Sequence, residues 1–261
     1  MQQAHGIAYT VSGPDDAPVI VLSNSLGTTI EMWSPQVDAL AHHYRVVRYD
    51  TRGHGASIAP AGEYSLDTLG RDVLAVLDAL NVERAHFCGI SMGGLTGQWL
   101  GVHAPERIDK LIVANTAARI GSLQGWLDRS ALVRSRGMAE VADGAARRWF
   151  TADFIARRPE VVERMTAGLR ATSAHGYAGC CDALSAADLR EEIATIASPM
   201  LVIAGRYDPV TTVDDARFIA ERVQGARVET LDASHLSNIE AAEGFTAAVL
   251  AFLAEAGGRK H

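Results

Sequence analysis

Cysteines, basic clusters and long apolar runs are all scarce in this 261-residue chain, and each absence removes a class of protein. The three cysteines, Cys88, Cys180 and Cys181, are too few and too unevenly placed for a disulfide framework. No apolar run reaches the length of a membrane span, and Met1–Gly13 lacks the basic and apolar regions of a secretory signal. The formal net charge of -7, without a Lys/Arg cluster, speaks against nucleic acid as a partner. We therefore expect a cytoplasmic protein with no membrane or nucleic-acid partner, and no feature of the sequence specifies an oligomeric state.

Apolar side chains are abundant: 48% of the residues are hydrophobic and 21% are charged, which is typical of a globular protein with a large core. Two runs, Val19–Leu22 and Leu201–Ala204, are apolar without alternation, as are strands that are covered on both faces of a parallel sheet. A further run, Ile7–Ser12, is expected to pair with a short N-terminal strand as an antiparallel edge. Altogether, six short β-rich runs bounded by turn residues predict strands at Val19–Ser23, Arg45–Tyr49, Ala85–Gly89, Lys110–Ala114, Met200–Ala204 and Arg227–Leu231.

Helical patterns lie between these runs. They predict helices over Leu66–Leu80, Leu95–His103, Thr212–Val223 and Glu240–Ala256. The alternation of strands and helices indicates a doubly wound α/β domain, with a mostly parallel central sheet and helices on both faces.

This alternation is interrupted between about Arg119 and Ser198, where the sequence predicts several helices and no strand. An all-helical insertion in an α/β domain is suited to form a lid over an active site. The insertion holds eleven arginines and no lysine against ten acidic residues, so it is slightly basic in an acidic chain. We expect a core domain made of residues 1–118 and 199–261 and a helical lid made of residues 119–198. The tail Gly257–His261 is expected to be disordered.

The predicted strand Ala85–Gly89 runs into the pattern G-x-S-x-G, with Ser91 at its centre and a predicted helix behind it. A tight strand-to-helix turn lifts the serine hydroxyl above the sheet, and the small residues on either side prevent a clash. The helix that starts there favours negative charge at its N-terminus. This context predicts the α/β-hydrolase fold with Ser91 as the nucleophile.

A serine hydroxyl needs a base that takes its proton, and in this fold the chain order is serine, acid, histidine. Asp208 follows the predicted strand Met200–Ala204, and His235 follows the last predicted strand. Both therefore lie beyond the carboxyl ends of strands, where the sites of open α/β sheets gather. We predict Ser91, Asp208 and His235 as the catalytic triad.

Rival acids and bases have simpler explanations. Asp50 ends a strand but precedes Ser91, and with Arg52 it is expected to tie a turn together, with His54 as a turn or pocket residue. His86 lies inside a strand and is expected to pack in the core. Asp182 and Asp188 fall in the insertion and are expected to be solvated, and Asp214 and Asp215 open a helix, where carboxylates cap amides.

A tetrahedral intermediate needs two backbone donors. The residue after the nucleophile, Met92, should supply one. The other should come from the loop that follows the strand Val19–Ser23, and we favour the amide of Leu26.

Several stretches of this chain resemble the bacterial 3-oxoadipate enol-lactonases, and the resemblance runs over nearly its whole length. The Asn24-Ser25 pair is informative because many related hydrolases carry His-Gly there. The predicted triad agrees with the family pattern. The resemblance rests on Leu22–Gly27, Tyr49–Gly55, Gly89–Gly94, Arg148–Thr151 and His235–Asn238.

The resemblance implies a small lactone substrate that carries a carboxylate and is opened to 3-oxoadipate in the β-ketoadipate pathway of aromatic catabolism. Neither acylation nor deacylation in that reaction requires a metal or an organic cofactor. An anionic substrate needs a local cation, and in the lid two arginines stand near tryptophans, which can stack on a flat ring. We therefore expect the substrate to be bound by Asn24, Trp126, Arg129, Arg148 and Trp149.

Other activities on the same triad stay open at this point. They are a carboxylesterase, a carbon–carbon bond hydrolase for ring-cleavage products and a cofactor-free haloperoxidase, and a non-catalytic ligand receptor is a further class. Turnover of a chromogenic ester would exclude the receptor, and perhydrolysis of acetate would reveal the haloperoxidase. Haloalkane dehalogenases and epoxide hydrolases of this shape use an aspartate nucleophile, and Ser91 speaks against both.

Overall fold

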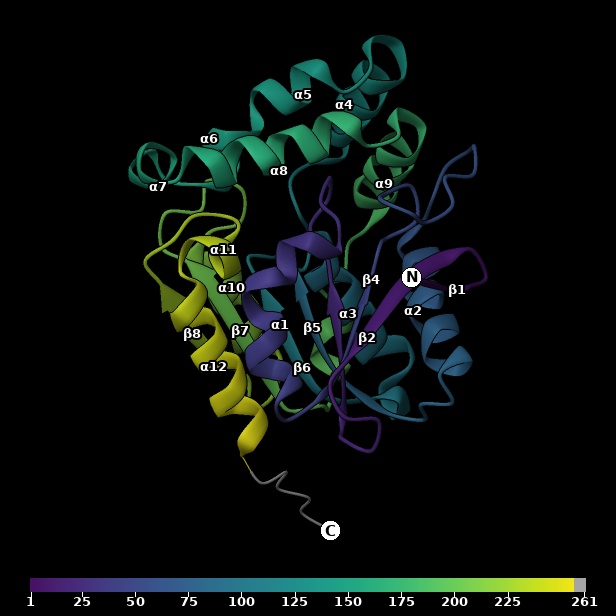
Figure 1. The fold of residues 1–261 in the computed structure, drawn as a ribbon, viewed down its shortest axis with the longest axis vertical. Coiled ribbons are helices and arrows are strands. Elements are labelled where there is room, and N and C mark those ends of the chain that lie inside the picture. The colour runs from purple at the N-terminus through teal and green to yellow at the C-terminus, as the bar shows by residue number, and fades with distance from the viewer. Residues whose placement is uncertain (256–261) are drawn as a thin grey trace.

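The computed structural model describes residues 1–255, and their strands form one eight-stranded sheet in the order β1-β2-β4-β3-β5-β6-β7-β8 (Figure 1). The pairs β1–β2 and β2–β4 are antiparallel, and all the others are parallel. The predicted mostly parallel sheet with an antiparallel edge is therefore confirmed. The strands are β1 (Gln2–Ala4), β2 (Ile7–Ser12), β3 (Val19–Ser23), β4 (Arg45–Tyr49), β5 (Ala85–Ile90), β6 (Ile108–Ala114), β7 (Met200–Gly205) and β8 (Arg227–Leu231).

Helices cover both faces of this sheet, which is why its central strands are apolar throughout. All residues of β3, β5 and β7 are buried, whereas the edge strand β8 is largely exposed and carries charge. One face is covered by α1 (Ser34–Ala41), α11 (Ser237–Glu240) and α12 (Ala242–Ala254). The other is covered by α2 (Leu66–Ala79), α3 (Met92–His103) and α10 (Val213–Arg222).

Helix starts differ from the sequence prediction where the periodicity is weak. The helix predicted at Leu95 begins at Met92, because its glycine-rich first turn carries no apolar stripe. The helix predicted at Glu240–Ala256 is α12, which begins at Ala242, and the short helix α11 before it was not predicted. The sequence analysis also missed α1, which is only eight residues long. Ala256 and the expectation for the tail Gly257–His261 lie outside the described residues.

The segment 119–198 contains six α-helices and, among its described residues, no strand. They lie together above the carboxyl ends of the strands at the top of Figure 1. The division into a core domain and a lid agrees with this arrangement and stays a prediction. The helices are α4 (Leu123–Arg136), α5 (Ala139–Asp143), α6 (Ala145–Trp149), α7 (Ala152–Arg157), α8 (Pro159–Ala171) and α9 (Ala174–Ala186).

A polar contact joins two of these helices, and it corrects the expectation that Asp182 is solvated. Asp182 is buried on α9, where it accepts a hydrogen bond of 2.6 Å from the Ser130 hydroxyl and pairs with the Arg134 guanidinium, both on α4. Asp188, by contrast, is partly exposed, as predicted, and pairs with two arginines at the surface. Among residues 1–255 there is no helix with the length and apolarity needed to cross a membrane.

Candidate active site

Ser91 is the single residue between β5 and α3, and it lies in a strained turn. Its backbone has φ +57° and ψ -116°, a conformation that residues with a side chain rarely adopt. The surrounding structure holds it there: the Ser91 amide donates to the Ala114 carbonyl at 2.9 Å, and the Thr116 hydroxyl donates to the Ser91 carbonyl at 2.8 Å. Strain that is maintained in this way is typical of a functional turn.

The two glycines of the motif are required by close backbone contacts. A Cβ on Gly89 would lie 2.3 Å from the carbonyl oxygen of Gly93, and a Cβ on Gly93 would lie 2.3 Å from the carbonyl oxygen of Ser23. No side chain fits at such distances. The G-x-S-x-G pattern is therefore a steric requirement of this turn.

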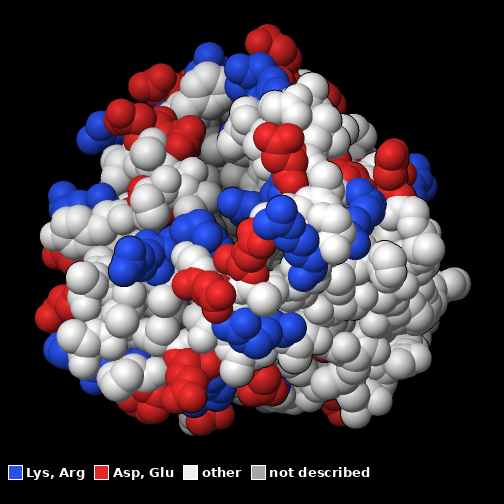
Figure 2. All heavy atoms as spheres, turned by 90° about the horizontal axis from the view of Figure 1, so that it is seen from above, with Lys and Arg blue, Asp and Glu red and all other residues white. Residues whose placement is uncertain are grey.

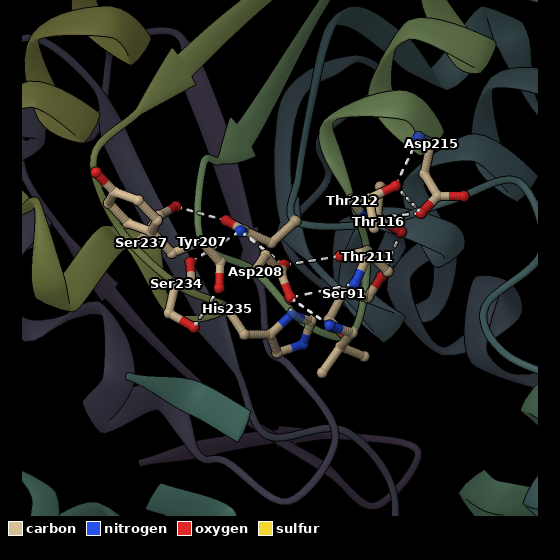
Figure 3. Close-up of polar contacts among 12 residues, drawn as sticks. Ser91, Thr116, Tyr207, Asp208, Thr211, Thr212, Asp215, Ser234, His235 and Ser237 are labelled. Atoms are coloured by element: carbon tan, nitrogen blue, oxygen red, sulfur yellow. Dashed lines mark hydrogen bonds and ion pairs between the residues drawn. The ribbon is translucent and has the colours of Figure 1, made fainter. Parts of the chain in front are cut away.

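Asp208 and His235 are joined in the same region, by a contact of 2.8 Å between Asp208 Oδ2 and His235 Nδ1. Figure 3 shows Asp208 between the imidazole and the turn at Thr211. The backbone amides of Val210 and Thr211 donate to Asp208 Oδ1, and the Thr211 hydroxyl donates to Oδ2. The carboxylate is thus fixed in one orientation toward the imidazole.

These contacts keep Asp208 ionised. Burial alone raises the pKa of this carboxyl, but the His235 imidazole and the hydrogen bonds from Asn115 and Val210 outweigh burial and leave the pKa below its usual range. An ionised Asp208 holds the Nδ1 proton of His235, so Nε2 is free to accept a proton. That is the tautomer a general base needs.

Ser91 and His235 line the same cavity, as the sequence predicted for a nucleophile and its base. Within residues 1–255 the Ser91 hydroxyl forms no hydrogen bond with the imidazole. Such contacts are often long in a free enzyme and shorten in the complex with substrate. The structure therefore brings the three predicted triad residues together, with the Asp–His pair already formed.

Asn115 supports Asp208, and the sequence analysis missed it. It follows β6 directly, is fully buried and has φ +44°. Its side-chain amide donates to Asp208 Oδ2 at 3.0 Å and to the Ser234 carbonyl at 3.1 Å, and it accepts a hydrogen bond from the Ser237 hydroxyl. Asn115 thus links the acid to the loop that carries His235. A polar residue directly after a buried parallel strand was the available signal.

The two amides predicted to stabilise an oxyanion have no acceptor within residues 1–255. Met92 is the first residue of α3, where amides have no partner inside the helix. The Leu26 amide lies in the loop after β3, and Leu26 lines the cavity beside Ser91. Both amides are therefore available, and their catalytic role stays a prediction.

Asn24 has a different place from the one expected, because it does not line the cavity. It is fully buried, and its side chain donates to the Tyr49 carbonyl at 2.9 Å and accepts from the Trp33 indole at 3.0 Å. Its carbonyl accepts from the Gly93 amide. Asn24 thus fastens the loop to β4 and to the elbow, and the expectation of a substrate contact is corrected.

The other four expected substrate residues do line the cavity, which has a volume of about 280 Å³. Its walls combine the elbow and His235 with lid residues from four helices: Trp126 and Arg129 of α4, Arg148 and Trp149 of α6, Leu169 of α8 and Tyr177 of α9. Seen from above, the lid side of the molecule has a hollow with basic side chains beside it (Figure 2). Side chains that are far apart in the sequence thus form one roof over Ser91.

The two arginines of this roof differ from most others in the lid. Seven of the eleven lid arginines pair with an Asp or Glu, whereas Arg129 and Arg148 have no such partner within residues 1–255. Arg129 lies over the Trp126 ring at 4.9 Å, and Arg148 donates to the Val141 carbonyl at 2.6 Å. Burial and the positive charge of Arg129 lower the pKa of Arg148. Two neighbouring cations thus line the cavity without an Asp or Glu partner among the described residues.

The rival acid Asp50 and the rival base His86 lie in structural positions outside the cavity. Asp50 accepts the amides of Ile30 and Ala56, as expected of a turn residue, and burial raises its pKa. His86 is buried within β5. Residues 1–255 hold no group of three or more His, Cys, Asp or Glu side chains arranged to bind a metal ion.

The comparisons with known proteins agree with this geometry. A family profile described as the alpha/beta hydrolase fold matches residues 18–242. The chain is 51% identical to 3-oxoadipate enol-lactonase 2 of Acinetobacter baylyi, over 94% of this chain and 92% of that one. It is 48% identical to 3-oxoadipate enol-lactonase 1 of the same organism, over 94% and 91%. The crystal structure of the enol-lactonase from Burkholderia xenovorans superposes with a TM-score of 0.95 at 48% identity, covering 97% of this chain and 98% of that one.

Proposed function

Because the chain belongs to the α/β-hydrolase fold family, and within it to the 3-oxoadipate enol-lactonases, we propose that it opens the ring of 3-oxoadipate enol-lactone to give 3-oxoadipate. It is a hydrolase that acts on a lactone ester. Two observations support this substrate: the arginines Arg129 and Arg148 line the cavity above Ser91 without a carboxylate partner among residues 1–255, and the chain is 51% and 48% identical to the enol-lactonases of Acinetobacter baylyi.

Acylation starts at Ser91. Its hydroxyl attacks the lactone carbonyl while Nε2 of His235 takes the proton, and Asp208 stabilises the imidazolium that forms. The carbonyl oxygen becomes negative, and the free amides of Leu26 and Met92 donate to it. Removing one such donor in related chemistry costs about 3 kcal/mol of transition-state stabilisation.

Collapse of the tetrahedral intermediate breaks the ring C–O bond. The leaving group is an enolate, which leaves more readily than an alkoxide. It takes back the proton that His235 removed from Ser91, which leaves the imidazole neutral again, and the resulting enol becomes a ketone. Because the substrate is a ring, the ketone arm stays attached to the acyl group on Ser91. His235 then takes a proton from water, which attacks the ester carbonyl. The second tetrahedral intermediate breaks the bond to Ser91, whose oxygen takes the proton from His235, and the dicarboxylate product is released.

The lid selects the substrate by charge and size. The carboxylate arm of the lactone pairs with Arg129 and Arg148, which relieves the repulsion between the two guanidinium groups. Trp126 and Trp149 offer flat apolar faces to the unsaturated ring. The cavity volume of about 280 Å³ is slightly below the range of roughly 300–1,000 Å³ that is usual for ligand pockets, which suits a small substrate.

A direct comparison of substrates tests the proposal. Purified protein is assayed on the enol-lactone, on its methyl ester, which lacks the negative charge, and on p-nitrophenyl acetate. We expect the highest kcat/KM on the enol-lactone and a large loss on its methyl ester. Equal kcat/KM on the lactone and the neutral esters would instead indicate a general carboxylesterase. A higher kcat/KM on a ring-cleavage diketone would indicate a carbon–carbon bond hydrolase, and a higher kcat/KM for bromination with peroxide and acetate would indicate a haloperoxidase.

A further inference from the structure

His54 reaches from the turn after β4 to the loop that holds one proposed oxyanion donor. Its Nε2 atom accepts a hydrogen bond of 2.9 Å from the backbone amide of Gly27. We propose that His54 is a positioning residue that fixes the loop Asn24–Gly27 so that the Leu26 amide points at the reacting carbonyl. The proposal rests on the ester hydrolysis at Ser91 proposed above, and it assigns a function to a side chain outside the triad.

Separate hydrogen bonds hold two successive peptide groups of the loop Asn24–Gly27. The Ser25 carbonyl accepts from the Thr28 amide at 3.1 Å and from the Thr28 hydroxyl at 2.7 Å. In a trans peptide the N–H points opposite to the C=O, so these bonds turn the Leu26 amide away from Thr28. In the next peptide group, Leu26–Gly27, the Gly27 N–H donates to Nε2 of His54. His54 therefore fixes the plane that follows the proposed donor.

Without an acceptor this second plane would be free to rotate. Gly27 has φ +82°, and glycine adopts positive and negative φ values about equally readily. Rotation of the Leu26–Gly27 peptide changes ψ of Leu26 and φ of Gly27, and so alters the backbone of the residue whose N–H is the proposed donor. The His54 bond opposes that rotation from outside the loop.

The imidazole is in the neutral tautomer that this role needs. His54 is buried, and its Nδ1 lies 3.1 Å from the Arg52 carbonyl, which can only accept. Nδ1 therefore carries the proton, and Nε2 is the acceptor for Gly27. Burial also lowers the pKa of His54 to about 4, so the acceptor persists at neutral pH. The Tyr177 ring of α9 lies beside it, and burial raises the pKa of that phenol.

The turn that carries His54 is itself rigidly supported. The Arg52 guanidinium makes two hydrogen bonds of 2.6 and 2.5 Å to the buried Asp72 carboxylate of α2. Gly53 meets Gly176 of α9 so closely that a Cβ on Gly53 would lie 2.4 Å from the Gly176 Cα atom. His54 thus links a fixed turn, packed under the lid, to the loop of the proposed oxyanion site.

Two substitutions separate this role from an ordinary turn contact. The carboxamide of His54→Asn lies where Nδ1 lies, so it can still donate to the Arg52 carbonyl but cannot reach Gly27. The longer carboxamide of His54→Gln reaches the place of Nε2 and can accept from Gly27. Both variants, the native chain and Ser91→Ala are assayed on p-nitrophenyl acetate, a neutral ester with no carboxylate for the lid arginines to bind. Thermal unfolding is measured in parallel.

We expect His54→Asn to lower kcat at least tenfold with KM within about threefold of the native value, and His54→Gln to recover most of kcat. Equal kcat in the two variants, or a change confined to KM, would overturn the proposal. If Ser91→Ala kept its turnover, the proposed function would fail and this inference with it. If Ser91→Ala were inactive while His54→Asn kept native kcat, only the inference would fail.

A measurement on the native chain covers the case in which the variants do not fold. Nitrogen NMR of ¹⁵N-histidine-labelled protein should show one imidazole in the Nδ1–H tautomer, with a hydrogen-bonded Nε2, that does not titrate between pH 5 and 8. Its signal should change when a boronic acid forms a tetrahedral adduct on Ser91. An Nε2–H tautomer for His54, or a signal that the adduct leaves unchanged, would contradict the proposal.

Discussion

Replacement of Arg148 by Met tests whether the lid recognises the carboxylate of the substrate. Methionine keeps most of the length and apolar surface of the side chain but removes the guanidinium. In the folded protein this guanidinium has one hydrogen bond, to the Val141 carbonyl, no carboxylate partner among the described residues, and a repulsive neighbour in Arg129. Because so few stabilising contacts are lost, we expect the free energy of unfolding to change by less than about 1 kcal/mol.

The effect on catalysis should be larger and should depend on substrate charge. A hydrogen bond to a charged group contributes about 1.5–3 kcal/mol, which corresponds to roughly 10- to 150-fold. We expect kcat/KM for the enol-lactone to fall by that factor, mainly through KM, in Arg148→Met and in Arg129→Met. For p-nitrophenyl acetate, kcat/KM should stay within about threefold of the native value. The two sets of constants come from one spectrophotometric assay of each substrate.

Arg147 provides the matched control, because it precedes Arg148 on α6, has no ion pair within residues 1–255, is exposed and does not line the cavity. Arg147→Met should leave both substrates unaffected. The reasoning would be refuted if Arg148→Met and Arg129→Met lowered kcat/KM equally on both substrates, since that pattern indicates a structural role. It would also be refuted if neither variant changed the enol-lactone constants.

Three further predictions concern the triad and the pH dependence of folding. Ser91→Ala should abolish turnover without unfolding the protein, and a phosphonate that labels active serines should modify Ser91; mass spectrometry that finds the label elsewhere would reject the assignment. Asp208→Asn should lower kcat about 10⁴-fold because it holds the wrong imidazole tautomer, whereas Asp50→Asn should mainly reduce stability; near-native kcat in Asp208→Asn would return Asp50 to consideration. The pKa of His54 is about 4 in the folded protein against about 6.5 when unfolded, so below pH 6.5 the unfolded chain binds the extra proton. The free energy of unfolding should therefore fall by roughly 3 kcal/mol between pH 6.5 and 4, and His86, whose pKa is also lowered, should contribute in the same direction. Urea titrations should show a smaller fall in His54→Gln, and the same fall in that variant would contradict the lowered pKa of His54.

The sequence by itself predicted the elements whose signals are local. A strand that is covered on both faces, such as β3 or β7, must be apolar at every position, so its run of residues is visible without knowledge of its neighbours. The turn at Ser91 is local in part: Gly89 is required by the carbonyl oxygen of Gly93 within the same turn, whereas Gly93 is required by the carbonyl oxygen of Ser23 at the end of β3. The order of serine, acid and histidine then predicted three residues that the structure brings together.

Only the tertiary structure decided which polar side chains share an environment. Eleven lid arginines are alike in sequence, and the packing of the lid helices on the sheet determines that two of them line the cavity while seven pair with carboxylates. The same long-range packing buries Asp182, turns Asn24 to Tyr49 and Trp33, brings Asn115 to Asp208 and sets His54 against Gly27. His54 and Gly27 are 27 residues apart in the sequence, and Asn115 and Asp208 are 93 residues apart. No local pattern specifies a hydrogen bond across such separations. Each is fixed by where the strand ends and lid helices meet in space, which depends on the whole core.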